Sequence, residues 1–115
     1  MPNQANPSQD SFPLIEQTWF TLRDSFADAY DACGKDAARK ASLTADRDGA
    51  RDAYYLAVSK KFDEADAFVT KTKDALATAN KALDAAIGDL AAIDTFIKNA
   101  TTAVQLAAAL AAMGT

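Results

Sequence analysis

The chain has 115 residues with 12 basic and 16 acidic side chains, no histidine and one cysteine, and its net charge is −4. This length allows one domain, and the acidic balance disfavours nucleic acid as a partner, because phosphate contacts need a face rich in Lys and Arg. The absence of histidine excludes serine–histidine and cysteine–histidine catalysis, and a single cysteine leaves no usual set of zinc ligands. We therefore expect a protein that is not an enzyme and that binds no cofactor or metal.

Residues 1–12 form a polar arm that contains two of the three prolines and several Asn, Gln and Ser side chains. Such a segment has little apolar surface to bury, so we expect no stable structure from it alone. It lacks a basic region followed by an apolar run, and the sequence therefore predicts no secretory signal peptide. We expect a cytoplasmic protein, or part of a particle assembled in the cytoplasm, and export by a non-classical route stays open.

Alanine is the commonest residue and no proline follows Pro13, a composition typical of helices. No segment alternates apolar and polar residues as a strand does, so we predict an all-α fold. The first helix is predicted over 13–33, because Pro13 suits a first helical turn and Gly34 suits a helix end. Its inner face is rich in aromatic residues, and Cys33 at its end is expected to be a buried thiol. Asp24, Asp28 and Asp31 share another face, which we interpret as a solvated acidic stripe.

Residues 34–43 are predicted to be a connector, after which Thr44 would cap a second helix. Two interleaved apolar series then continue at heptad spacing, one of large side chains and the other mostly alanine. Such a repeat is typical of helices that pack on other helices, as in a coiled coil. Because the register continues past Gly88, we predict one Ala-rich helix over 44–113, about 100 Å long at 1.5 Å per residue. A break near Gly88, which would give a three-helix bundle, is the alternative.

We predict that the short first helix folds back antiparallel on the start of the long one, giving a helical hairpin or bundle in a single domain over 13–115. The residues expected in its aromatic core are Trp19, Leu22, Phe26, Tyr55 and Phe62. The first helix covers only about a third of the long helix by the same rise, so most of the seam would lack a partner within the chain. The seam residues expected to bind a partner are Phe62, Val69, Leu76, Leu83, Leu90, Ile93, Ile97 and Val104.

An uncovered apolar stripe of this length is typical of an interaction surface. The sequence therefore favours a structural protein that self-associates through the seam into a homo-oligomer. An adaptor or chaperone-like module that binds another helical protein is the first alternative. A membrane-acting helical oligomer is the second, because residues 99–113 carry no charge. Membrane binding is nevertheless not expected, since alanine is too weakly apolar to hold so short a segment in a bilayer.

Overall fold

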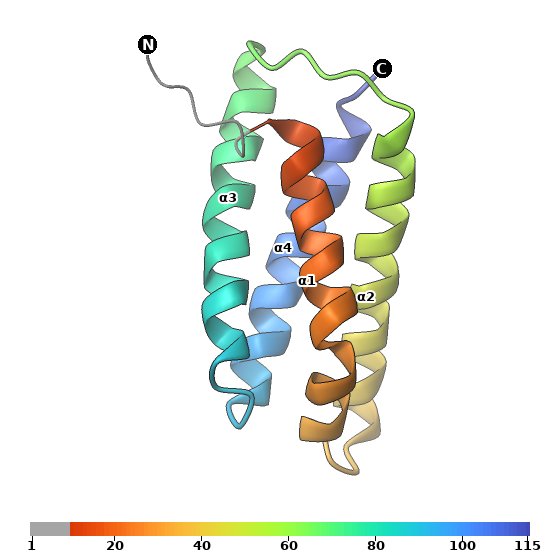
Figure 1. The fold of residues 1–115 in the computed structure, drawn as a ribbon, viewed down its shortest axis with the longest axis vertical. Helices are drawn as coiled ribbons and strands as arrows, with labels where there is room; N and C mark the ends of the chain where they lie inside the picture. Colours follow the sequence, from red (N-terminus) through yellow and green to blue (C-terminus); the bar gives the residue numbers. More distant parts are fainter. Residues whose placement is uncertain (1–9) are drawn as a thin grey trace.

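A computed structural model describes residues 10–115, which form four helices of similar length (Figure 1). α1 spans Ser11–Ala32, α2 spans Ala37–Val58, α3 spans Ala67–Ile87 and α4 spans Ile93–Ala112. The predicted all-α fold is confirmed, since this part of the chain contains no strand. No helix within the same residues is both long and apolar enough to cross a membrane.

The predicted polar arm lies mostly outside the described residues, which exclude 1–9. Its last two positions, Ser11 and Phe12, already belong to α1, so the helix begins earlier than Pro13. Glu64, from the segment between α2 and α3, accepts hydrogen bonds from the backbone N–H of Ser11 at 3.2 and 3.3 Å. A distant carboxylate thus satisfies a helix-terminal N–H group that sequence patterns near residue 13 do not reveal.

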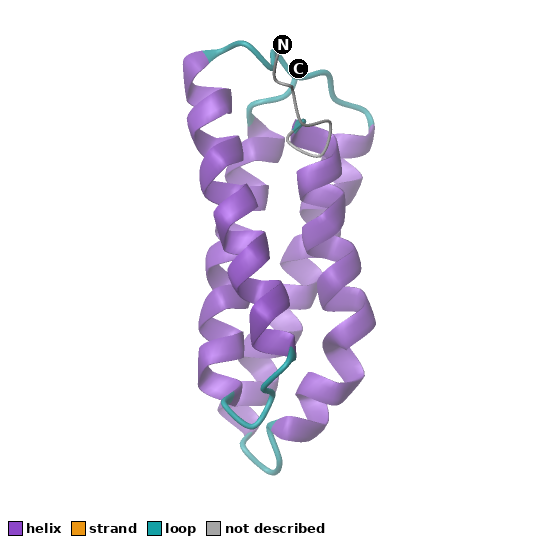
Figure 2. Cartoon of the chain, turned by 60° about the vertical axis from the view of Figure 1, so that its left-hand side comes forward, coloured by secondary structure: helices purple, strands orange, loops and turns teal. Residues whose placement is uncertain are grey.

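The helices form two antiparallel hairpins, α1–α2 and α3–α4, that pack side by side (Figure 1). Residues 59–66 cross the upper end of the bundle from the end of α2 to the start of α3. α1 and α4 pack against each other across the centre, whereas α2 and α3 lie at the other two corners, with no Cα atom of one within 8 Å of a Cα atom of the other. The four helix axes are nearly aligned, and the connections between helices lie at the two ends of the bundle (Figure 2). The molecule measures 47 × 26 × 19 Å.

The single helix predicted over 44–113 is wrong, because two breaks divide this region. The first break, residues 59–66, is polar, and aspartate side chains there offer hydrogen bonds that compete with those of a helix. The carboxylate of Asp66 accepts from the N–H of Phe68 at 2.9 Å and of Val69 at 3.0 Å, which fixes the start of α3. The three-helix alternative lacked this break as well.

The second break lies just after α3, close to the position that the three-helix alternative gave it. The N–H of Gly88 donates to the carbonyl of Ala85 at 3.2 Å, and the N–H of Asp89 donates to that of Ala86 at 3.1 Å. These bonds span three residues and tighten the last turn, as at many helix ends. The chain then returns as α4 beside α3 (Figure 1).

The start of α2 also differs from the prediction, because the connector after α1 is short. Asp36 caps α2, its carboxylate accepting from the N–H of Arg39 at 3.1 Å. Thr44, the predicted cap, lies inside α2, where its hydroxyl donates to the carbonyl of Lys40 at 2.8 Å. Gly34 has a φ of 62°, a left-handed conformation that turns the chain from α1 toward α2.

The core runs along the bundle axis and combines large residues with many alanines. Phe96, Leu76 and Leu83 are fully buried, as are several alanines of α4. One polar cluster lies among them: the hydroxyl of Thr18 on α1 donates to Oδ1 of Asn80 on α3 at 2.7 Å. Nδ2 of Asn80 in turn donates to the carbonyl of Leu14 at 3.1 Å. These hydrogen bonds satisfy buried polar atoms and fix the register between α1 and α3.

Candidate protein-interaction groove

The predicted partner seam is buried inside the bundle. Leu76 and Leu83 are fully buried, and the other seam residues are buried or partly buried against the same core: Phe62, Val69, Leu90, Ile93, Ile97 and Val104. The expectation of a long uncovered stripe is therefore wrong. The physical reason is that the two breaks let each helix bury its apolar face against the others, as in a four-helix bundle.

The residues predicted for the aromatic core lie in different environments. Leu22 is buried, and Trp19 and Phe26 pack against the core from its edge. Tyr55, by contrast, is 63% exposed, so its assignment to the core is wrong. The preceding residue, Tyr54, faces α1 instead, and its ring centroid lies 5.6 Å from that of Phe12. One residue corresponds to a rotation of about 100° around a helix, enough to move a side chain from core to solvent.

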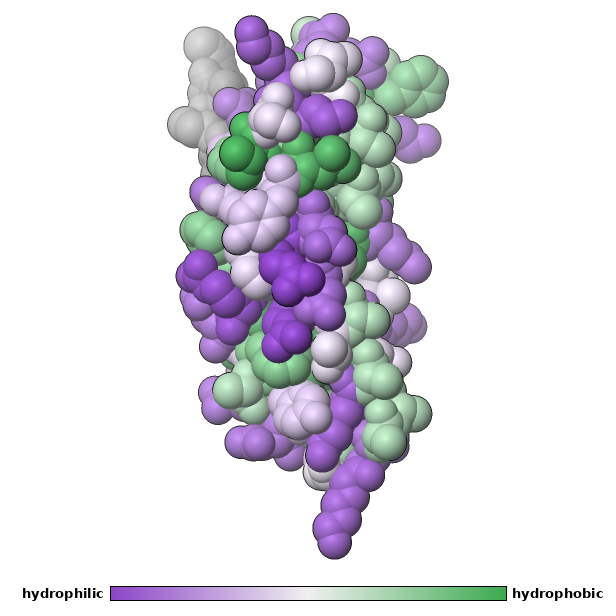
Figure 3. Space-filling view, turned by 90° about the vertical axis from the view of Figure 1, so that its right-hand side faces the viewer, coloured by the Kyte–Doolittle hydropathy of each residue, from purple (hydrophilic) through white to green (hydrophobic). Residues whose placement is uncertain are grey.

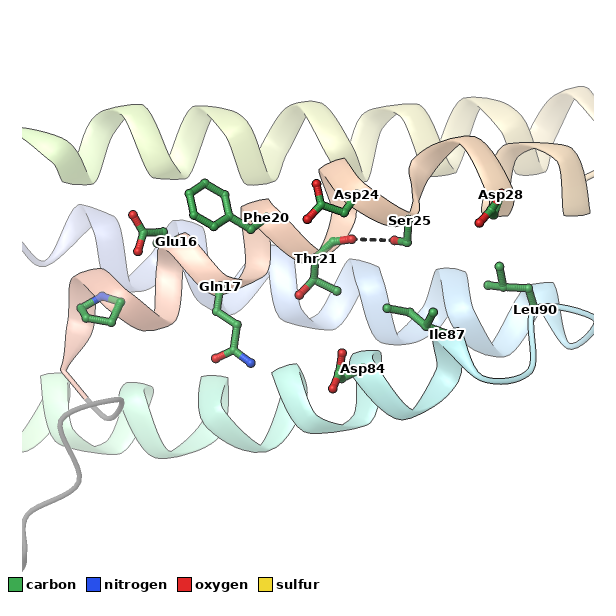
Figure 4. Close-up of a pocket in the computed structure, with 11 residues that line it drawn as sticks. Glu16, Gln17, Phe20, Thr21, Asp24, Ser25, Asp28, Asp84, Ile87 and Leu90 are labelled. Carbon is green, nitrogen blue, oxygen red and sulfur yellow. Dashed lines mark hydrogen bonds between the residues drawn. The ribbon is translucent and has the colours of Figure 1, made fainter.

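A groove of about 500 Å³ lies along α1 on the side of α3 (Figure 4). One face of α1 lines it with residues three and four positions apart: Pro13, Glu16, Gln17, Phe20, Thr21, Asp24, Ser25 and Asp28. Asp84 and Ile87 of α3, with Leu90 of the following loop, complete the lining. The stretch of α1 from Pro13 to Asp28 gives the groove a length of about 22 Å at 1.5 Å per residue.

The groove combines apolar and acidic side chains. Phe20, Ile87 and Leu90 are the large apolar side chains that line it, and all three are partly buried. In Figure 4, Ile87 and Leu90 lie across from Ser25 and Asp28 of α1. No basic residue of the described part of the chain lines the groove. Four acidic residues do so: Glu16, Asp24, Asp28 and Asp84.

One basic side chain borders the groove without lining it. Nε of Arg23 lies 3.0 Å from Oδ1 of Asp24, and its guanidinium stands 4.3 Å from the ring centroid of Phe20. Both members of the Arg23–Asp24 pair are largely exposed, so the pair contributes little in water. The groove as a whole therefore presents an excess of negative charge around an apolar floor.

Ser25 is a buried serine that lines the groove. The hydroxyl of Ser25 donates to the carbonyl of Thr21 at 2.6 Å, within its own helix (Figure 4). No group of three His, Cys, Asp or Glu side chains is placed to hold a metal ion within residues 10–115. Cys33 lies elsewhere, with Sγ 3.4 Å from the carbonyl of Ala29, and burial raises the pKa of its thiol, which disfavours the reactive thiolate.

A second apolar surface lies at the end of α2. Tyr55, Leu56 and Val58 are 63%, 45% and 55% exposed. Figure 3 looks onto the side of the molecule that carries α2 and shows hydrophobic side chains in its upper part, above a more hydrophilic middle. None of these three side chains lines the groove along α1.

The chain matches no known protein family, no curated protein and no solved structure. Its functional interpretation therefore depends on the shape and chemistry of its own surface.

Proposed function

We propose that this chain is a non-catalytic interaction module that binds another protein, as an adaptor or chaperone-like helical domain does. The observation that carries the proposal is the groove beside α1, which joins an apolar floor to an acidic rim. Concave sites with apolar floors and a few polar groups are the usual form of binding sites. Pairs of neighbouring helices offer such grooves to a third helix.

The test is binding of amphipathic helical peptides to the full chain. A panel of three such peptides, with basic, neutral or acidic polar faces, is titrated into the chain and followed by fluorescence anisotropy. We expect at least one peptide to bind, with affinity reduced about tenfold by Leu90→Ser, since that change removes a contact of about 1–2 kcal/mol. The matched change Leu56→Ser, at an exposed position that does not line the groove, should leave binding unaltered. Circular dichroism of both variants checks that they remain folded, and a panel without any binding contradicts the proposal.

Self-association is a second candidate, favoured by the exposed apolar residues at the end of α2. A seam-based assembly would require the two hairpins to separate, because its residues pack in the core. The surface formed by Tyr55, Leu56 and Val58 needs no such rearrangement. Light scattering over a range of concentrations tests this candidate. A mass that rises with concentration for the parent chain, but not for Leu56→Lys with Val58→Lys, would support it.

A further inference from the structure

The shape of the groove selects the kind of ligand. Its long wall is α1, whose backbone N–H and C=O groups are hydrogen-bonded within the helix, so it offers no edge for an extended strand. Polyproline ligands dock between aromatic ridges, and Phe20 is the single aromatic among the described lining residues. A groove about 22 Å long, beside a straight helix, instead accommodates about four turns of another helix.

The charge of the groove selects the kind of helix. Acidic side chains stand on both sides of the apolar floor, with Asp28 on α1 and Asp84 on α3. Neither of these two, nor Glu16, forms an ion pair with the basic side chains of residues 10–115. A ligand with Lys or Arg on both flanks of an apolar stripe would complement this pattern.

We propose that the groove between α1 and α3 binds a basic amphipathic helix of a partner protein. The apolar side chains of that helix contact Phe20, Ile87 and Leu90, and its Lys or Arg side chains pair with Asp28 and Asp84. This inference rests on the proposed function and adds the chemistry of the partner. The docked helix lies beside α1 and α3 and continues the helix-on-helix packing of the bundle. The negative charge of the groove repels acidic helices, and its attraction for a positively charged helix accelerates encounter.

Three synthetic peptides of about 14 residues, which suits a groove of this length, test the proposal. They share the same leucine positions and carry Lys, Gln or Glu on the polar face. Fluorescence anisotropy with the full chain at low salt should show the Lys peptide binding about tenfold more tightly than the Gln peptide. The Glu peptide should not bind. The preference for Lys should shrink in about 0.5 M salt, because salt screens exposed charges.

A pair of matched double variants separates the site from the net charge. Asp28→Asn with Asp84→Asn should weaken binding of the Lys peptide about fivefold, since two exposed ion pairs are lost. Asp52→Asn with Asp74→Asn removes the same charge from exposed positions outside the groove and should change binding less than twofold. Equal losses from the two double variants would overturn the proposed site.

The remaining outcomes distinguish the inference from the proposed function. Equal binding of the Lys and Gln peptides, both weakened by Leu90→Ser, would overturn the charge preference while the groove still binds helices. Absence of binding by all three peptides would overturn both.

Discussion

The hydroxyl of Thr101 on α4 donates a hydrogen bond of 2.8 Å to the carboxylate of Asp46 on α2. Asp46 is 8% exposed, and burial raises the pKa of its carboxyl group, while the bond from Thr101 offsets part of this effect. The pair joins the two hairpins through helices that belong to different halves of the chain. The hydrogen bond therefore links α2 to α4 at a position where burial disfavours the ionised form of Asp46.

The first prediction concerns the pH dependence that Asp46 imposes. A carboxyl group with a raised folded-state pKa favours folding at low pH, and this contribution is lost as pH rises through the folded-state pKa. Asp46→Asn keeps an oxygen to accept from Thr101 but never becomes charged. We expect it to raise the free energy of unfolding at pH 7, with the difference from the parent shrinking toward low pH. Urea unfolding at several pH values measures this. A variant that is less stable at pH 7 would show that the charged form is stabilised by the fold.

The second prediction concerns Glu64, which ties the crossover segment to the start of α1. Its carboxylate accepts from the hydroxyl of Ser11 at 2.6 Å and lies 3.1 Å from Nζ of Lys73. Burial acts to raise the pKa of Glu64, but the hydrogen bonds from Ser11 and Lys73 outweigh it, and the net shift is downward. Its stabilisation is therefore present above the unfolded-state pKa and lost as pH falls through the folded-state pKa. We expect Glu64→Ala to cost about 1–2 kcal/mol at neutral pH, as the loss of a helix cap does.

The control for this prediction is Glu16→Ala, the other glutamate of the chain. Glu16 lines the groove and should change the free energy of unfolding by no more than about 0.5 kcal/mol. Chemical unfolding at pH 7 and near pH 3 compares the two variants. A penalty for Glu64→Ala that persists unchanged at low pH would contradict an origin in the ionised carboxylate.

The helical class of this chain could be predicted from its sequence, but the number of helices could not. Counting heptads places Phe62 and Leu90 in the apolar series, yet both lie in connections between helices. The heptad pattern continues across the breaks because alanine is compatible with an apolar position on any face of a helix. Local chemistry was the better signal: Asp66 stands just before the apolar run of α3, as a cap does.

The groove could be predicted only in part. Asp24 and Asp28 were recognisable as an exposed acidic face of the first helix. These aspartates line a groove only because Ile87 and Leu90 lie beside them. Ile87 and Leu90 follow them by about sixty residues and reach this place only through the folding of the second hairpin. A periodic pattern identifies which face of a helix is buried, but it does not identify which helix becomes its neighbour. The pattern also placed Tyr55 in the core, whereas it is the neighbouring Tyr54 that packs against α1.

The third prediction contrasts two phenylalanines that the bundle places in opposite environments. Phe96 is fully buried, whereas Phe68 is 75% exposed at the start of α3. We expect Phe96→Ala to lower the free energy of unfolding by about 3–5 kcal/mol, because it leaves a cavity in the core. Phe68→Ala should change it by about 0.5 kcal/mol or less. Thermal and urea unfolding measure both, and similar costs for the two variants would contradict the arrangement of the four helices.

The last prediction concerns the close approach of α2 and α4 at Gly49. A Cβ atom added to Gly49 would lie 2.8 Å from Cγ1 of Val104, a buried and conformationally stiff side chain. Gly49→Ala gains about 1 kcal/mol of helix propensity but overpacks the interface by about 1–3 kcal/mol. We therefore expect a net loss of about 1 kcal/mol in the free energy of unfolding.

Two further variants make this prediction specific. Gly88→Ala adds a methyl group where the nearest atom is the carbonyl oxygen of Ala85 at 3.4 Å, and φ is −67°. It should stabilise the chain by about 0.4–1 kcal/mol by restricting the unfolded state. Adding Val104→Ala to Gly49→Ala makes room for the methyl group, so the double variant should be at least about 1 kcal/mol more stable than the sum of the single changes predicts. Stabilisation by Gly49→Ala alone, equal to that of Gly88→Ala, would mean that α2 and α4 lie farther apart than the structure places them.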